Sequence, residues 1–183
     1  GVVPQITAVF GNCGGGMAVA SAMSDFTFME SKKAKLFVNS PNALDGNHES
    51  KCDTASAKFQ SEDAGLVDFT GSEDEIYAGI RELVSMLPSN NEDDMSYEEC
   101  TDDLNRASET LENAVGDPAV ICSEIGDDHV FVETKAAYAK EMATGFIRLN
   151  GMTVGVVGNR TESYDEDGNV AEKYADVLTA RGA

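Results

Sequence analysis

One cysteine and three glycines follow a short apolar segment near the start of the chain. Residues 6–10 are apolar and rich in β-branched side chains, the run Asn12-Cys13-Gly14-Gly15-Gly16 follows, and residues 17–23 are almost wholly Ala, Met, Val and Ser. This order predicts a strand, a turn and a helix small enough to lie tight against a sheet. Backbone N–H groups at a helix N-terminus favour negative charge, so the turn is a candidate anion or oxyanion site.

Judged from this stretch alone, the glycine turn has two other interpretations. Three glycines can form a close-packed turn without any ligand, and this interpretation stays open. A dinucleotide-binding fingerprint fits worse, because Gly14-Gly15-Gly16 is followed by Met17-Ala18-Val19 without a spaced third glycine.

The next elements suggest a β-β-α rhythm. Residues 25–29 and 35–38 read as short strands, and residues 64–68 read as an edge strand. A helix is predicted over 73–87, because five aliphatic side chains fall on one face and Pro88 ends the pattern.

The second half of the chain contains an acidic stretch and a hairpin signal. Residues 92–112 hold nine acidic side chains and one Arg, which predicts a solvated linker or an exposed helix. Asn150-Gly151, at the centre of residues 145–157, is typical of a two-residue hairpin turn. Residues 170–181 read as a helix. We place a boundary in the acidic stretch, with one domain over 1–112 and the start of another over 113–183. The chain opens directly on strand-like sequence without an initiator Met, so we expect it to be part of a longer polypeptide.

The formal net charge of -20 narrows the partner classes. Such a surface repels nucleic acid and anionic membranes. The four widely spaced cysteines lack the close pairs of zinc sites, which predicts reduced thiols. No stretch approaches the length of an apolar membrane span, so we expect a soluble cytoplasmic protein.

Several strings resemble one enzyme family. GNCGGGMAVASAMSDFTFM at 11–29 resembles the glycine-rich turn and following strand of the carboxyltransferase subunits of biotin-dependent acyl-CoA carboxylases and decarboxylases. KLFVNSPNAL at 35–44 is similar to that family's next strand and Gly/Ser-Pro loop, and AGLVDF at 64–69 to a stretch of the wider crotonase superfamily. The most specific match runs from Tyr138-Ala139-Lys140 to GFIRLNGMTVGVVGNR at 145–160, which resembles the start of the family's second crotonase-like domain.

The resemblance implies an α/β fold of crotonase-like ββα spirals, with part of one domain and the opening of a second. It implies transfer of CO2 between biotin on a carrier protein and the α-carbon of an acyl-CoA, with a thioester enolate and a biotin ureido oxyanion to stabilise. The N–H groups of Gly15 and Gly16 are the expected catalytic donors. Expected substrate contacts are Gly14, Met17, Asn39, Ser40 and Pro41, and a plain turn at the last three is the alternative.

The resemblance also implies binding partners. The expected partners are a biotin carboxyl carrier protein and further copies of the chain, as a dimer or a dimer of trimers, with a possible membrane decarboxylase complex.

CoA phosphates need positive charge, and the tight cluster of lysines is Lys32, Lys33 and Lys35, although solvated turn lysines are the simpler interpretation. No motif pairs Cys13 with either histidine as a catalytic dyad.

Two other functions remain open from sequence. A crotonase-type enoyl-CoA hydratase or isomerase would share the oxyanion turn but would need a pocket carboxylate. The alternative from another functional class is a non-catalytic fragment that serves assembly or docking of the carrier protein.

Overall fold

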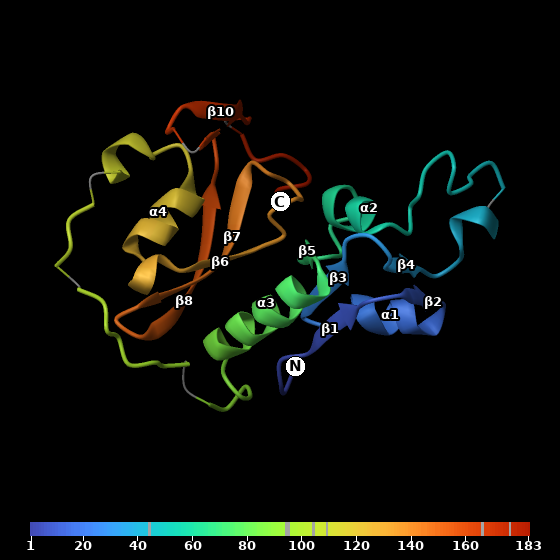
Figure 1. The fold of residues 1–183 in the computed structure, drawn as a ribbon, viewed down its shortest axis with the longest axis horizontal. Coiled ribbons are helices and arrows are strands. Elements are labelled where there is room, and N and C mark those ends of the chain that lie inside the picture. The colour runs from blue at the N-terminus through green and yellow to red at the C-terminus, as the bar shows by residue number, and fades with distance from the viewer. Residues whose placement is uncertain (44, 94–95, 104, 109, 166, 176) are drawn as a thin grey trace. The chain divides into compact units, whose positions relative to one another are not determined.

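The computed structural model describes residues 1–43, 45–93, 96–103, 105–108, 110–165, 167–175 and 177–183. Leu44 of the resemblance at 35–44, four residues of the acidic stretch and two residues of the C-terminal region (Asp94, Met95, Leu104, Glu109, Glu166 and Asp176) lie outside the described residues. The chain forms two compact units, residues 1–84 with 89–91 and residues 85–88 with 92–183. Figure 1 shows the path of the chain.

The first unit is built on short parallel strands. β1 (Ile6–Val9), β3 (Phe26–Glu30) and β5 (Phe69–Gly71) form a parallel sheet in the order β1-β3-β5. β2 (Asn12–Gly14) and β4 (Lys35–Phe37) form a second parallel pair. The strands predicted over 6–10, 25–29 and 35–38 are therefore confirmed. From β1 to β2, and again from β3 to β4, the chain passes from the three-stranded sheet to the parallel pair.

Helices complete the first unit. They are α1 (Gly16–Ala22), the 3-10 turn η1 (Pro41–Ala43), α2 (Ala57–Glu62) and α3 (Glu73–Met86), whose last two residues belong to the second unit. One buried cluster joins β1, β3 and β4 to the helices, through Val9, Ala18, Met29, Ala34, Leu36, Ala57 and Val67. The predicted helices over 17–23 and 73–87 are confirmed as α1 and α3, with Ala18 of α1 in this cluster and Ile76 and Leu83 of α3 buried.

Residues 64–68, predicted as a strand, lie outside β5, and only Asp68 at their end reaches the sheet, where its amide donates to the Thr27 carbonyl at 2.8 Å. The amide of Ala64 donates to the Phe59 carbonyl at 2.9 Å, and the amide of Leu66 to the Gln60 carbonyl at 3.0 Å. The segment therefore closes the end of α2, and the strand begins only at Phe69. A local helix end takes the backbone donors that the sequence pattern assigned to a ladder.

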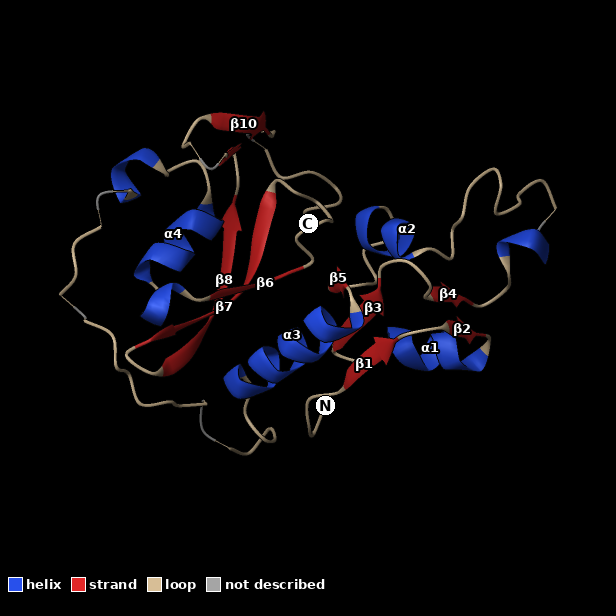
Figure 2. Cartoon of the chain, in the orientation of Figure 1, coloured by secondary structure: helices blue, strands red, loops and turns tan. Residues whose placement is uncertain are grey.

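The second unit is an antiparallel sheet with a helix packed on it (Figure 2). β6 (Phe131–Thr134), β7 (Met142–Leu149) and β8 (Met152–Asn159) pair in that order. α4 (Pro118–Ile125) packs on these strands and is flanked by the 3-10 turns η2 (Leu111–Asn113) and η3 (Asp127–His129). The predicted hairpin is confirmed, with Asn150 at φ 52° and Gly151 at φ 82° between β7 and β8.

The predicted helix over 170–181 is wrong. β10 (Val170–Lys173) pairs antiparallel with β9 (Glu162–Tyr164), and the described residues after it contain no helix. The turn between the strands is closed by the Asp165 carboxylate, which accepts hydrogen bonds from the amides of Asp167 and Asn169. Because Asx-type bonds set this turn, the chain reverses and pairs where its composition favours helix.

Over its described residues the acidic stretch is mostly exposed and contains no α-helix, so the solvated alternative fits better than the exposed helix, although the stretch also contacts the second unit. Tyr97 bridges Met152 at the edge of β8, and the Glu98 amide donates to the Gly151 carbonyl at 2.9 Å. Arg106 donates to the Glu124 and Gly126 carbonyls at 2.7 Å each, at the C-terminal end of α4. The stretch is thus an extended segment tied to the second unit at both ends.

Candidate functional site

The glycine turn sits between β2 and α1, and two of its glycines are sterically required. Gly15 has φ 60° and ψ -131°, a conformation that residues with a Cβ atom rarely adopt. A Cβ atom on Gly14 would lie 2.9 Å from the Phe37 ring. A Cβ atom on Gly15 or Gly16 would meet nothing within 4 Å, so the outer side of the turn is open.

The turn distributes its backbone donors differently from the prediction. The Gly15 amide donates to the Phe37 carbonyl at 3.0 Å, whereas the amides of Ala18 and Val19 turn back to the Gly15 carbonyl. Gly16 and Met17 are the first two residues of α1, where amides lack an acceptor inside the helix. The predicted Gly15 donor is therefore engaged in joining β2 to β4, and the amides of Gly16 and Met17 are the first-turn donors of α1.

The loop after β4 lies beside this turn. In the parallel pair, Asn12 is opposite Lys35 and Gly14 is opposite Phe37, so both strands end at the same edge. The Gly14 end of β2 therefore lies beside Phe37, two residues before the loop that contains Asn39, Ser40 and Pro41. Asn39 is exposed, Ser40 is half-buried and Pro41 is buried at the start of η1.

The three lysines predicted as a phosphate cluster do not act alike. Lys32 and Lys33 are exposed, and their backbone amides donate to the Glu30 carboxylate. These amide bonds, that of Lys33 above all, hold the pKa of Glu30 below its usual value. Lys35 instead forms ion pairs with Glu49 and Asp53, so its ammonium group is already engaged.

Cys13 has structural contacts rather than catalytic ones. Its thiol lies 3.5 Å from the Ser21 hydroxyl and packs against the buried cluster of the first unit. Within the described ranges no histidine hydrogen-bonds to it, and all four cysteines are free thiols. The described residues also contain no group of three or more His, Cys, Asp or Glu that could hold a metal ion.

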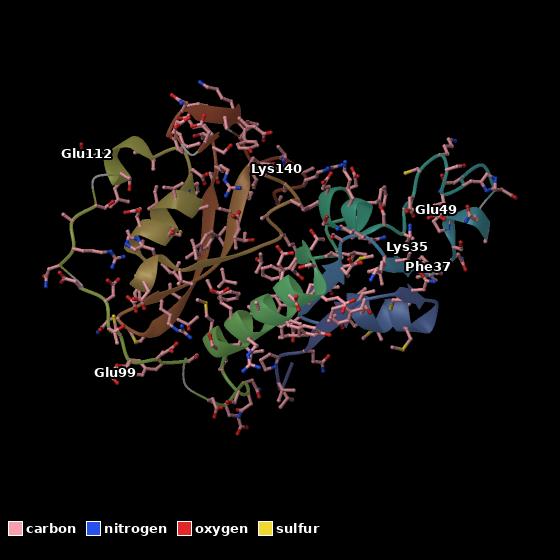
Figure 3. The ribbon with its side chains drawn as sticks, in the orientation of Figure 1. Lys35, Phe37, Glu49, Glu99, Glu112 and Lys140 are labelled. Carbon is pink, nitrogen blue, oxygen red and sulfur yellow. The ribbon has the colours of Figure 1, made fainter. Side chains whose placement is uncertain are left out.

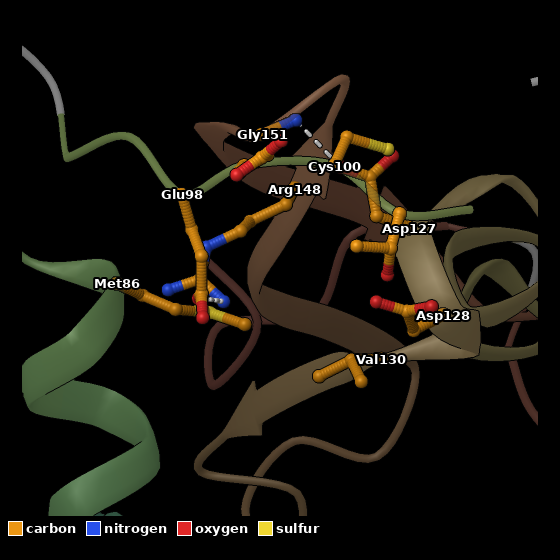
Figure 4. A pocket seen from close by; sticks show the side chains of 10 residues that line it. Met86, Glu98, Cys100, Asp127, Asp128, Val130, Arg148 and Gly151 are labelled. Carbon is orange, nitrogen blue, oxygen red and sulfur yellow. Dashed lines mark hydrogen bonds and ion pairs between the residues drawn. The ribbon is translucent and has the colours of Figure 1, made fainter.

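Sequence reasoning missed a polar hollow of about 260 Å³ in the second unit (Figure 4). The Asp127 carboxylate accepts hydrogen bonds from the amides of Asn150 and Gly151, and so fixes the hairpin turn. Burial alone would raise the pKa of Asp127, but these bonds lower it below its ordinary value. The pKa of the adjacent Cys100 thiol is raised by burial and by Asp127.

Arg148 forms the opposite wall of this hollow. It pairs with Glu98 at 2.7 Å and donates to the Ser85 carbonyl at 2.7 Å. Asp127 and Arg148 are therefore both engaged by neighbouring groups, and Asp127 is the one that fixes the hairpin turn. Only the Gly126-Asp127-Asp128 stretch after α4 could have pointed to the hollow from sequence, and that signal is weak.

The fold and the site together define a class of protein. The carboxyl transferase domain family model matches residues 1–181, and the chain belongs to that family.

The individual relatives are named as carboxylase and decarboxylase subunits. A propionyl-CoA carboxylase carboxyltransferase subunit from Haloferax mediterranei is 32% identical over 171 residues, which cover 87% of this chain and 33% of the relative. A methylmalonyl-CoA decarboxylase subunit alpha from Propionigenium modestum is 30% identical over 173 residues, covering 88% and 34%. The chain therefore spans about a third of the length of these relatives.

A solved structure agrees with these relatives. Transcarboxylase 12S, determined with hydrolysed methylmalonyl-coenzyme A bound, superimposes with a TM-score of 0.77 at 29% identity over 87% of this chain and 33% of that one. The predicted α/β carboxyltransferase fold is confirmed. No helix in the described parts of the chain is both long and apolar enough to cross a bilayer.

Proposed function

We propose that the protein containing this chain is the carboxyltransferase component of a biotin-dependent acyl-CoA carboxylase or decarboxylase. It moves a carboxyl group between biotin on a carrier protein and the α-carbon of an acyl-CoA. The observation that carries this proposal is the family match over residues 1–181, together with the glycine turn and the Asn39–Pro41 loop at one strand edge.

The chain's own residues supply binding and charge stabilisation. The amides of Gly16 and Met17 donate to an oxygen that gains negative charge during transfer, and Gly14 and Gly15 shape the turn that presents them. Asn39, Ser40 and Pro41 line the acyl side of the pocket. The open space beside Gly15 and Gly16 fits close approach of a planar group. When bound, biotin supplies the ureido nitrogen that carries the carboxyl group.

The proposal extends to domains, partners and location. The proposed division puts residues 1–112 in the first crotonase-like domain and residues 113–183 at the start of the second, although residues 92–112 pack within the second compact unit. The protein works with a biotin carboxyl carrier protein and as a homo-oligomer, a dimer or a dimer of trimers, in the cytoplasm. Two observations support these partners: the relatives include carboxylase and decarboxylase subunits, and the similar transcarboxylase 12S assembles as a hexamer.

The test is label exchange by the protein expressed from its complete gene. We expect it to exchange labelled carboxyl between a carboxylated acyl-CoA and free biotin or a biotinyl carrier. Gly16→Val should reduce exchange by about 10²- to 10³-fold, because the side chain displaces the oxyanion from its donors. Gly11→Val is the matched control, since a Cβ atom there also meets nothing within 4 Å.

Two outcomes would count against the proposal. One is an absence of exchange by the assembled wild-type protein. The other is hydration of an enoyl-CoA that disappears when one pocket carboxylate is replaced by its amide, since that is the signature of a hydratase.

A further inference from the structure

Lys35 opens β4 and is held by two carboxylates from a later part of the chain. Its ammonium nitrogen lies 2.8 Å from the Glu49 carboxylate and also contacts Asp53. Figure 3 shows Lys35 close to Glu49, on the strand that also carries Phe37. The hydrogen bonds that the ammonium group donates to Asp53, and then to Glu49, raise the pKa of Lys35 above its usual value, so the group stays charged across the physiological range.

Glu49 passes this restraint to the predicted acyl loop. The Glu49 amide donates to the Asn42 side-chain oxygen at 2.9 Å, and the Asn42 side-chain amide lies 3.4 Å from the Glu49 carboxylate. The Asn42 backbone amide then donates to the Ser40 hydroxyl at 3.3 Å. A continuous set of polar contacts therefore runs from Lys35 to Ser40.

The far end of the same segment is also fixed to β4. The Leu36 amide donates to the Ala55 carbonyl at 2.9 Å, and Lys35 bridges Ser56. The described residues between Asn42 and Asp53 thus return to the strand from which the Asn39–Pro41 loop leaves. Lys35 is the cation at the centre of this closure.

Each contact is partly exposed and weak alone, since the Lys35 and Glu49 side chains are 26% and 47% accessible. For catalysis, however, the position of the loop matters more than the strength of the contacts that hold it. A misplacement of about 1 Å at a reacting group can reduce the rate about 10²-fold. A modest restraint on the loop is therefore large enough to be visible in kinetics.

We propose that Lys35 is a positioning residue that holds the Asn39–Pro41 loop against the glycine turn and thereby sets which acyl groups the pocket accepts. The inference rests on the proposed function for its substrate. It assigns Lys35 a role in acyl selectivity in place of the phosphate contact predicted from sequence.

The kinetic test compares Lys35→Met, Lys35→Arg and Lys58→Met in the protein expressed from its complete gene. Lys58 is the matched control, because it forms an exposed ion pair with Glu62 on α2. Each variant is assayed with the acyl-CoA that the wild type uses best and with thioesters one methylene shorter and longer. We expect Lys35→Met to lower kcat/KM for the best substrate about 10- to 100-fold. It should also reduce the discrimination between chain lengths, whereas Lys35→Arg retains most of that discrimination and Lys58→Met retains all of it.

The structural test uses hydrogen exchange on the same variants. The amides of Asn42 and Glu49 should exchange faster in Lys35→Met than in the wild type, and at wild-type rates in Lys58→Met. Glu49→Gln, which removes one charge at an exposed position, should give the same direction of change if Lys35→Met does not fold.

The outcomes separate the two proposals. Unchanged selectivity across chain lengths, or unchanged exchange at Asn42 and Glu49, overturns the role of Lys35. A wild-type protein that transfers carboxyl to no acyl-CoA overturns the proposed function and the acyl selectivity with it, while faster loop exchange in Lys35→Met would still establish the restraint.

Discussion

The backbone amide of Gly15 donates to the carbonyl oxygen of Phe37 at 3.0 Å, and this bond joins the two loops of the candidate site. It extends the β2–β4 pairing by one step beyond Gly14 and Phe37. The next two amides along the chain, those of Gly16 and Met17, belong to the first turn of α1, where the helix itself offers no acceptor.

Alanine substitutions at Gly15 and Gly16 should distinguish a need for glycine's backbone conformation from a need for open space. Gly15→Ala places a Cβ atom on a residue at φ 60°, and should destabilise the protein by about 1–3 kcal/mol. Gly16→Ala has open space and a helical position, so its free energy of unfolding should stay within about 1 kcal/mol of wild type. Urea unfolding followed by circular dichroism measures both. Equal destabilisation of the two variants would contradict this conformational assignment.

The buried ion-pair network of the second unit should be sensitive to loss of its cation. Arg160 contacts Asp117 and Glu133 at 2.8 Å each, and the Arg160 and Asp117 side chains are 8% and 9% exposed. Arg160→Met leaves Asp117 buried without its cation, which should cost about 3–5 kcal/mol. Lys173→Met is the control, because its ion pair with Glu162 is mostly exposed and should change stability by less than about 1 kcal/mol. A thermal melt in which both variants match the wild type would argue against the network.

The Asp127 carboxylate should make the second unit sensitive to acid. Its pKa in the folded protein is lowered, so its contribution is present above the unfolded pKa of about 3.9 and is lost as pH falls through the lower folded pKa. Asp127→Asn should therefore destabilise the protein at pH 7 by about 1–3 kcal/mol, and the difference should shrink below pH 4. Urea unfolding at several pH values measures this, with the exposed Asp167→Asn as control. A difference that stays constant to pH 3 would show that charge is not involved.

Salt should stabilise the chain. With a formal net charge of -20, repulsion among surface carboxylates opposes the compact state, and salt screens charges separated by about 10 Å or more at 0.1 M. The urea midpoint should rise between about 0.02 and 0.5 M KCl, where the Debye length falls below about 5 Å. The partly buried Arg160 network should contribute little to the change. A midpoint that falls with salt would mean that exposed ion pairs outweigh the net repulsion.

Local patterns were sufficient for much of the first unit. The β-branched run at 6–10 and the one-sided aliphatic pattern of 73–87 are signals that tertiary packing reinforces, and both elements formed as predicted. Asn150-Gly151 identified its hairpin for a similar reason, since few residue pairs other than these adopt two successive left-handed conformations easily.

Other features depended on partners far away in sequence. Residues 170–173 have helical composition, yet they pair with 162–164 because the Asp165 turn reverses the chain. The engagement of Lys35 by Glu49 and Asp53, and of the Gly15 amide by Phe37, required the folded loops and strands themselves. Local sequence thus predicted the glycine turn and its neighbouring loop as the candidate site but did not show which of their groups were already engaged.

The single arginine of the acidic stretch has a consequence for how such sequences diverge. Arg106 alone, among the described residues of this stretch, joins it to the terminal carbonyls of α4, while many of the acidic side chains around it face solvent. Substitutions among those exposed side chains should accumulate freely between related organisms. A change at Arg106 would remove the contact with the carbonyls after α4, while the contacts of Tyr97 and Glu98 at the β7–β8 hairpin would remain, and only another cation at this position could replace what was lost.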